Sequence, residues 1–228
     1  MHKLGLIGSR GLFGNEICKF YTPVHVYNSD NIQELAQERF NTVICAAPSA
    51  NRRIAQQNPQ ADSDSVDRII AALSAQRIQR LVLIGTIDSV VYPDTAYGRN
   101  RLRLETFVKQ EFEHHYVLRF GNIVGASIKK NVLFDLKHDQ FLASINLNSF
   151  TQWYPLKRLQ TDIEHALLHS SYEQTLVSGP IQIKEIVERF FPEKLTHVGA
   201  NPGAISDYNL PSVVDTQQVF DCMAEYCR

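Results

Sequence analysis

A tyrosine and an arginine four residues apart open a helix-forming stretch that runs from Thr95 to Glu105 and reads TAYGRNRLRLE. A tyrosine phenol can give or take a proton, and a neighbouring cation lowers its pKa by favouring the phenolate. Four positions span about one helical turn, so Tyr97 and Arg101 share a face of the predicted helix. The spacing predicts a proton-transfer pair in which Tyr97 is the acid/base.

Arg101 belongs to the inward-facing stripe of this helix, whereas the two neighbouring arginines do not. The stripe comprises Tyr97, Arg101, Leu104, Val108 and Phe112. Arg99 and Arg103 point roughly the opposite way and are expected at the surface. A guanidinium in the stripe needs a partner, because an unpaired buried charge is costly. A cofactor ribose, a substrate phosphate or a carboxylate elsewhere would serve; alternatively, Arg101 reaches water from the first helical turn.

A hydroxyl that could assist this pair ends the apolar run LVLIGT. In a parallel sheet, ligands bind outside the carboxyl ends of the strands. Thr86 stands at such an end and could hydrogen-bond a substrate oxygen while Tyr97 transfers the proton. It could equally cap local backbone, and the sequence leaves both roles open.

Three glycines follow the first apolar run of the chain at regular intervals, in GSRGLFG. The first glycine of such a loop allows a tight turn, the second lets the backbone approach a pyrophosphate, and the third lets the helix pack on the strand. The helix N-terminus then offers amide donors and the positive end of its dipole. The pattern predicts a dinucleotide site rather than a glycine-rich turn without a ligand. Its loop residues are Gly8, Ser9, Arg10, Gly11, Leu12, Phe13 and Gly14.

The choice between NAD and NADP depends on two positions. A carboxylate at the end of the second strand would accept both ribose hydroxyls of NAD, but Asn28 stands there, with Asp30 slightly beyond. Arg10 could pair with a 2′-phosphate or could be a solvated loop cation. The combination favours NADP.

Strands and helices alternate through the first half of the chain. Strands are predicted at 3–7, 24–27, 42–46, 81–84 and 116–120, and helices at 12–20, 32–39, 62–76 and 96–113. Asp62 is a plausible N-cap of the third helix. Because each strand is a nearly continuous apolar run, the pattern indicates a parallel sheet covered on both faces. We predict an α/β fold with a Rossmann-like, doubly wound parallel sheet.

The rhythm becomes less regular after residue 125. Expected elements are helices at 132–136, 162–170 (opened by a capping box at 161–164) and 183–191 (closed by Pro192), strands at 149–154 and 175–177, a loop over 195–212 and a last helix from Thr216. We therefore divide the chain into a dinucleotide-binding core, 1–125, and a small C-terminal substrate lobe, 126–228, packed on that core.

Composition restricts the class of protein. The 228 residues suit one globular domain or one domain with a small appendage, and 44% are hydrophobic. A formal net charge of −1 gives no field that would recruit nucleic acid or an anionic membrane. The four cysteines lack the spacing of a disulfide scaffold or a zinc site, so no metal is expected. No signal-like or membrane-spanning run is seen, and we expect a cytoplasmic location.

In the order and content of these motifs, the chain resembles the extended short-chain dehydrogenase/reductase superfamily, in particular its NAD(P)-dependent epimerase/dehydratase family. The matching segments come in the family's order over about residues 3–190. They are GSRGLFG (8–14), VICAAP (43–48), LVLIGTIDSVVY (81–92), YGRNRLRLE (97–105), LRFGNIVG (118–125), TDIEHAL (161–167) and PIQIKEIVERF (180–190). The fourth of these is similar to the family's YGxSKxxxE, and Arg10 is similar to the arginine of NADP-using members.

The resemblance implies a role for each matching position. Tyr97 would be the catalytic acid/base, Thr86 its hydroxyl partner, and Arg101 would occupy the position of the family's lysine. Further implied contacts are Asn28, Ala46 and Ala47 on the adenosine side, Phe120 and Gly121 at the nicotinamide, and Asn122 at the substrate. Lys129 and Lys130 could hold a diphosphate or form a surface basic spot. The implied chemistry is hydride transfer between a nucleotide-sugar carbon and the nicotinamide.

The sequence departs from the family pattern in three ways. Arginine replaces lysine at position 101, which puts proton transfer in doubt but not cofactor binding. The connection from Thr86 to Tyr97 is shorter than in most members, and the whole chain is short for an extended member. Two hypotheses follow: an NAD(P)-dependent epimerase, dehydratase or reductase acting on a sugar or nucleotide-sugar, or a non-catalytic NAD(P)-binding sensor. We favour the enzyme, because a sensor would not need Tyr97, Thr86 and Asn122 together; a homodimer is also compatible with the resemblance.

Overall fold

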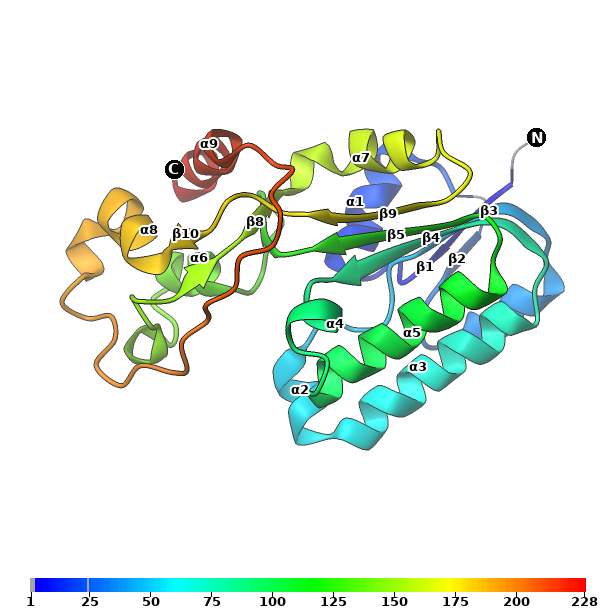
Figure 1. The fold of residues 1–228 in the computed structure, drawn as a ribbon, viewed down its shortest axis with the longest axis horizontal. Helices are drawn as coiled ribbons and strands as arrows, with labels where there is room; N and C mark the ends of the chain where they lie inside the picture. Colours follow the sequence, from blue (N-terminus) through cyan, green and yellow to red (C-terminus); the bar gives the residue numbers. More distant parts are fainter. Residues whose placement is uncertain (1–2, 24) are drawn as a thin grey trace. The chain divides into compact units, whose positions relative to one another are not determined.

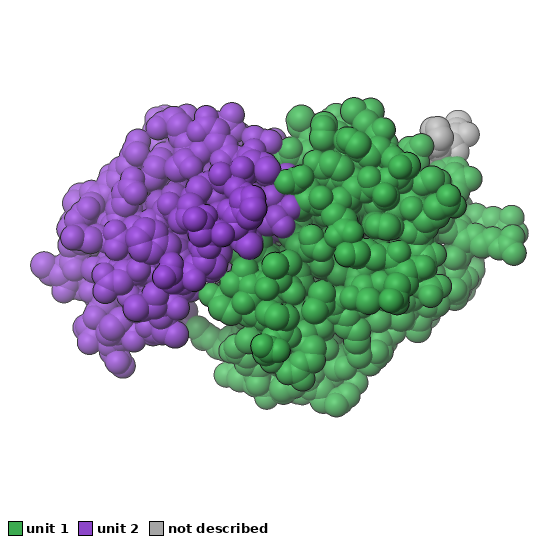
Figure 2. Space-filling view, in the orientation of Figure 1, with its two compact units in different colours: residues 1–119, 159–174 green, residues 120–158, 175–228 purple. Residues whose placement is uncertain are grey.

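The computed structural model describes residues 3–23 and 25–228, which form two compact units (Figure 2). Unit 1 comprises residues 1–119 and 159–174, and unit 2 comprises residues 120–158 and 175–228. Val24, expected at the start of the second strand, lies outside the described residues. The sequence-based division into 1–125 and 126–228 stays a prediction.

A six-stranded sheet, almost wholly within unit 1, has the order β2-β1-β3-β4-β5-β9 (Figure 1). Its strands are β1 (Leu4–Ile7), β2 (His25–Tyr27), β3 (Phe40–Cys45), β4 (Ile78–Thr86), β5 (His115–Phe120) and β9 (Tyr172–Leu176). β1 pairs in parallel with both β2 and β3, and β3 with β4. The chain leaves β1 for β2 on one side and returns to β3 on the other, so the strand order reverses between β1 and β3. The predicted doubly wound α/β fold is confirmed.

Helices cover both faces of this sheet. Unit 1 contains α1 (Leu12–Phe20), α2 (Arg52–Gln57), α3 (Pro59–Ser74), α4 (Asp88–Val91), α5 (Ala96–Glu111), α7 (Leu159–Ala166) and the 3-10 helix η1 (Ile32–Gln37). Figure 1 shows α3 and α5 packed side by side on one face and α1 with α7 on the other. Val43, Leu81 and Leu83 of the sheet meet Val66 of α3 and Leu104 of α5 in one buried cluster. That cluster fixes the orientation of α5.

Three details of unit 1 correct the sequence-based expectation. Helix α2 was not predicted, whereas the short helix expected at 32–39 is present as the 3-10 helix Ile32–Gln37. Asp62 is not the N-cap of α3, because Asn58 accepts the capping bond from Ala61 and Pro59 occupies the first helical turn. The capping box expected at 161–164 lies inside α7, since the chain already turns helically over Leu156–Arg158.

Unit 2 is built from short elements. They are β6 (Asn122–Val124), α6 (Val132–Lys137), η2 (Leu142–Ser144), β7 (Phe150–Thr151), β8 (Trp153–Pro155), η3 (Leu156–Arg158), β10 (Ile181–Gln182), α8 (Ile183–Phe190), η4 (Pro192–Lys194) and α9 (Thr216–Cys227). Residues 195–212 form the expected loop. Gln152 holds it from inside: the fully buried side chain accepts from the Leu210 amide at 2.7 Å and donates to the Leu210 carbonyl at 2.8 Å. Among the described residues, no helix is long and apolar enough to cross a membrane.

The cysteines offer a test of this packing. Cys18 is exposed, whereas Cys45 is buried in β3, and burial raises the pKa of the Cys45 thiol to about 11. Because the thiolate is the nucleophile, we expect a thiol reagent at about pH 8 to modify Cys18 rapidly and Cys45 only after unfolding. Site-resolved mass spectrometry measures both rates, with Cys18→Ser as the control that removes the fast reaction. Equal labelling rates at the two sites would contradict the burial of β3.

Candidate active site

The glycine loop lies at the point where the strand order reverses. β1 and β3 end side by side, with Ile7 paired to Cys45, so Gly8 and Ala46 follow at neighbouring strand ends. Gly8 has φ +88°, and a Cβ on it would lie 2.5 Å from the Ala46 carbonyl oxygen. Only glycine fits such a turn. This crevice at the carboxyl edge is where doubly wound sheets bind dinucleotides.

The other two glycines of the loop differ in what surrounds them. A Cβ on Gly14 would lie 2.2 Å from the Gly8 carbonyl oxygen, so the start of α1 packs directly on the loop. A Cβ on Gly11 would meet only the carbonyl oxygens of Gly8 and Ala46, at 3.4 and 4.0 Å. Packing among the described residues therefore explains glycine at position 14 and not at position 11. A ligand that approaches the backbone would explain the second glycine.

The residues expected to distinguish NAD from NADP interact with one another. Arg10 donates to Asp30 at 2.7 Å, and both side chains are exposed. This contact with Arg10 holds the pKa of the Asp30 carboxyl below its usual value. The Asn28 side-chain oxygen accepts from the Asp30 amide at 2.8 Å. The loop cation is thus paired with a carboxylate at the end of β2.

The predicted stripe of α5 is buried as expected, and Arg101 within it pairs with the carboxylate of Asp62. Its Nη2 lies 2.9 Å from Oδ1 of Asp62 and its Nη1 lies 3.1 Å from Oδ2, which is a bidentate contact. Nη2 also donates to the Ser49 carbonyl at 2.8 Å. The Arg101 side chain is only 6% exposed, so the alternative in which it reaches water is wrong. Arg99 and Arg103 are exposed, as predicted.

Tyr97 contacts this ion pair directly. The central carbon of the Arg101 guanidinium lies 4.1 Å from the centre of the Tyr97 ring, within the range of a cation-π interaction. Tyr97 itself is 5% exposed. The two residues that the sequence placed on one helix face are therefore in contact.

Thr86 is engaged by a second buried carboxylate. Its hydroxyl donates to Oδ2 of Asp88 at 2.9 Å and accepts from the Asp88 amide at 3.3 Å, so Thr86 has the local capping role that the sequence left open. Arg52 donates to the same Asp88 oxygen through Nε at 2.8 Å, and its Nη2 lies 2.6 Å away. Asp88 is 3% exposed although Arg52 is about half exposed. This second ion pair covers the carboxyl end of β4.

The two ion pairs act on Tyr97 with opposing effects. Burial raises the pKa of the Tyr97 phenol, Arg101 opposes the rise, Asp88 adds to it and Arg52 opposes it. Arg101 lowers the pKa of Tyr97 as expected of a neighbouring cation, but the net direction is upward. Removal from water outweighs the cation.

Gly98 brings α4 and α5 together at this site. A Cβ on Gly98 would lie 2.0 Å from the Tyr92 carbonyl oxygen and 2.6 Å from that of Asp88. The helix can therefore begin next to α4 only because position 98 has no side chain. This close approach keeps Tyr97 beside the carboxyl end of β4.

A buried glutamate further along α5 ties the site to neighbouring elements. Glu105 is 2% exposed and accepts from Ser89 of α4 at 2.6 Å and from Arg119 of β5 at 2.8 Å. Burial raises the pKa of Glu105, while Arg119 and Ser89 oppose the rise. The contacts fix α4 and β5 relative to α5.

The remaining predicted residues belong to unit 2, and their roles stay predictions. Phe120 ends β5 and packs edge-on against Tyr154, with ring centres 4.6 Å apart. Gly121 has a structural explanation of its own, because a Cβ there would lie 2.4 Å from the Gln152 carbonyl oxygen. The Asn122 amide donates to the same carbonyl at 2.9 Å. Lys129 and Lys130 are exposed.

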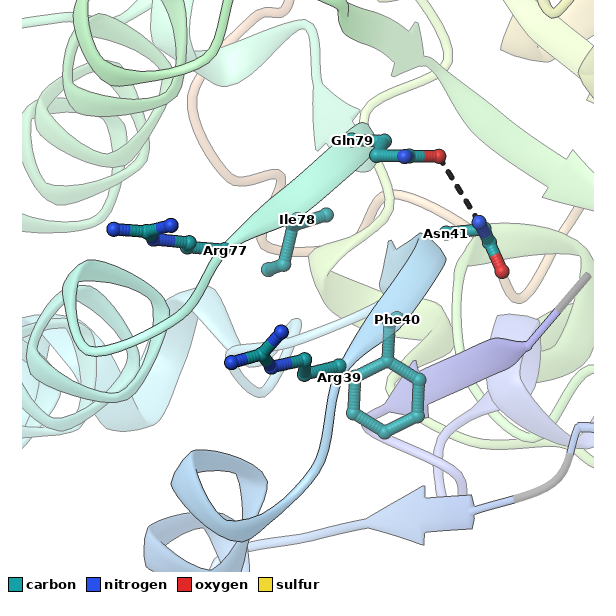
Figure 3. A pocket seen from close by; sticks show the side chains of 6 residues that line it. All are labelled: Arg39, Phe40, Asn41, Arg77, Ile78 and Gln79. Atoms are coloured by element: carbon teal, nitrogen blue, oxygen red, sulfur yellow. Dashed lines mark hydrogen bonds between the residues drawn. The ribbon is translucent and has the colours of Figure 1, made fainter.

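A cavity of about 450 Å³ lies at the opposite edge of the sheet, where β3 and β4 begin (Figure 3). It is lined by Arg39, Phe40, Asn41, Arg77, Ile78 and Gln79. Asn41 donates to Gln79 at 3.0 Å across it, and both arginines are exposed. Because the cavity opens at the amino ends of the strands, it is separate from the Tyr97 site.

Sequence reasoning missed three charged residues of the site. Asp88 stands two residues after the end of β4, at the carboxyl edge of the sheet, and that position is a signal that could draw attention to it. Asp62 stands near a helix start, where the sequence predicts a cap, and Arg52 lies in α2, which the sequence does not predict. Their partners are distant in sequence, so no local spacing indicates the pairs.

Solved structures of other proteins share the fold of this chain. No protein-family model and no curated protein sequence matches the chain. A UDP-glucose 4-epimerase from Thermotoga maritima, solved with UDP-glucose, is similar with a TM-score of 0.71 and 11% identity over 98% of each chain. A dTDP-4-dehydrorhamnose reductase from Bacillus anthracis, solved with NADP, has a TM-score of 0.66 and 17% identity, covering 90% of this chain and 85% of the other. A UDP-glucose 4-epimerase from Stenotrophomonas maltophila with bound NAD has a TM-score of 0.65 and 14% identity, covering 99% and 92%. The fold implied by the family resemblance is confirmed.

Substituting the glycines tests how the site is packed. We expect Gly98→Ala to lower the free energy of unfolding by about 1–3 kcal/mol, because the new methyl group overlaps the Tyr92 carbonyl. Gly11→Ala has room and ordinary backbone angles, so we expect it to cost less than about 1 kcal/mol. Denaturant titration of both variants measures the difference. Equal losses would contradict the close approach of α4 and α5.

Proposed function

We propose that the protein is an NAD(P)-dependent oxidoreductase or epimerase/dehydratase that transfers hydride to or from a sugar or nucleotide-sugar. The observation that carries the proposal is the position of Tyr97. This buried phenol touches a fixed cation and lies beside the carboxyl end of β4. It belongs to the same unit as the glycine loop after β1.

The chain's own residues fit a dinucleotide. The backbone at Gly8 and Gly14 has no space for a side chain, and Gly11 is a glycine that the protein's internal packing does not require. Gly8, Gly11 and the first turn of α1 would hold the pyrophosphate, with Ser9, Leu12 and Phe13 completing the loop. Ala46 and Ala47 follow β3 at the switch point and would line the adenosine side. When bound, the nicotinamide supplies the hydride acceptor or donor.

Tyr97 would give the substrate oxygen its proton. Burial raises the pKa of Tyr97, which favours the protonated phenol. A hydroxyl has one proton to donate, and that of Thr86 is already donated to Asp88. Of Thr86 and Tyr97, Tyr97 is therefore the residue that can donate to a carbonyl oxygen. We therefore propose that Tyr97 donates a proton to the substrate oxygen when a carbonyl is reduced and accepts it back in the reverse reaction.

The solved structures that resemble this chain support the proposal. The similar structures are described as nucleotide-sugar epimerases and a reductase, and their bound molecules include NAD, NADP and UDP-glucose. A small-molecule substrate follows by analogy. Asn122, Lys129 and Lys130 remain candidates for substrate contacts, and a homodimer and a cytoplasmic location remain predictions.

We expect the protein to bind NADH or NADPH, which nucleotide fluorescence measures. We expect Tyr97→Phe to lower turnover on a panel of nucleotide-sugars by at least about 100-fold, with little change in nucleotide affinity. Removing the hydroxyl removes the proton donor and keeps the ring. Arg99→Gln, an exposed change in the same helical turn, is the matched control and should retain the wild-type rate.

Each other outcome has a definite meaning. If neither nucleotide binds, the dinucleotide site is wrong. Binding without turnover on any panel member would favour the alternative, a non-catalytic NAD(P)-binding sensor. Turnover that is insensitive to Tyr97→Phe would remove Tyr97 from the mechanism.

The Arg10–Asp30 pair gives a prediction about cofactor choice. We propose that NADP is preferred once Arg10 turns to the 2′-phosphate, for which Asp30 competes. Asp30→Asn removes the competitor, so we expect the ratio of NADPH to NADH affinity to rise by about tenfold, or about 1.4 kcal/mol. Arg10→Gln should lower the same ratio. A ratio unchanged in both variants would contradict a role for this pair.

A further inference from the structure

A buried carboxylate that the proposed function does not use lies behind Arg101. Asp62 is in the first turns of α3, and its side chain is 9% exposed. Both of its oxygens accept from Arg101, and Oδ2 also accepts from the Asn100 amide group at 2.8 Å. Two neighbouring residues of α5 thus donate to a single carboxylate of α3.

These bonds fix the guanidinium in position and orientation. A bidentate contact holds a planar group more strictly than a single bond would. Nη1 and Nη2 of Arg101 are committed to Asp62 and to the Ser49 carbonyl. The guanidinium held in this way lies 4.1 Å from the centre of the Tyr97 ring.

Asp62 reaches Tyr97 through Arg101. The charged groups that act on the Tyr97 phenol are Arg101 of α5, Asp88 of α4 and Arg52 of α2. Asp62 forms the bidentate contact that holds the nearest of these charges, the Arg101 guanidinium, in place. Loss of Asp62 would therefore change the position of the Arg101 guanidinium relative to the Tyr97 ring.

We propose that Asp62 is a positioning residue of the active site, which holds Arg101 against the Tyr97 ring and so sets the charge that the phenol experiences. The inference rests on the proposed function for the importance of Tyr97, while its test does not require cofactor or substrate. Asp62 and Arg101 would together take the place of a single lysine. An arginine anchored in this way is held with its guanidinium against the phenol ring.

A second pair on the same two helices supplies the matched control. Arg103 of α5 lies 3.0 Å from Asp67 of α3, but those side chains are 41% and 57% exposed. Exposed pairs of this kind contribute little to stability or to the field at a buried group. Asp67→Asn therefore removes the same charge from the same helix without moving Arg101.

The experiment places 3-fluorotyrosine at position 97 and follows its titration by ¹⁹F NMR in the full-length protein. Fluorination lowers the intrinsic pKa of the phenol, which brings its titration into a range where the protein is folded. We expect Asp62→Asn to move the Tyr97 titration upward by about one pKa unit, as Arg101→Gln does, because the cation leaves the ring in both. In the Arg101→Gln background, Asp62→Asn should produce no further shift.

Asp67→Asn should leave the titration unchanged. A downward or absent shift in folded Asp62→Asn would overturn the proposal, since Arg101 would then stay at the ring without Asp62. If Asp62→Asn fails to fold, the double variant, which leaves no unpaired buried guanidinium, is compared with Arg101→Gln. Equal titrations support the proposal, and a difference overturns it because Asp62 would then act without Arg101. Failure of the proposed function would appear instead as absent nucleotide binding.

Discussion

The Asp62–Arg101 ion pair is the interaction on which the arrangement around Tyr97 depends. Taking both charges out of water is costly, and the cost is offset only where geometry is good and the other polar atoms are satisfied. Here the contact is bidentate, Asn100 supplies a further donor and the Ser49 carbonyl a further acceptor. The pair therefore joins α3, α5 and the segment after β3 at one point.

Opposing effects act on the pKa of Tyr97, and burial is the largest of them. Burial favours the neutral phenol, and the Asp88 carboxylate acts in the same direction. Arg101 and Arg52 act against them without reversing the net direction. A phenol in this situation gives up its proton readily only to an acceptor that the site brings close, which suits a residue that must remain a donor until substrate arrives.

The sequence predicts those parts of the fold and the site whose pattern lies within a single helix or strand. Local patterns predicted β1, β3, β4, β5, α1, α5 and α9, because apolar runs and helical spacing are complete within one element. The buried stripe of α5 was predicted for the same reason. The local patterns missed the short strands β6 and β10 of unit 2. Asp62 was misread because an acidic residue near a helix start has a local explanation, while its actual partner lies 39 positions away. Arg52 and Asp88, 36 positions apart, form a pair that no local pattern could indicate.

The replacement of lysine by arginine at position 101 becomes intelligible once its counter-charge is included. A lysine ammonium is a compact charge on a flexible stem, and it can turn between a phenol and a ribose. A guanidinium is planar and larger, and it makes two parallel bonds to a carboxylate while its face remains free to contact an aromatic ring. Asp62 of α3 provides that carboxylate, with its two oxygens 2.9 and 3.1 Å from the Nη atoms of Arg101. A lysine at position 101 could not make the bidentate contact that fixes the plane of the guanidinium against Tyr97, so we interpret the arginine and Asp62 as a single functional unit.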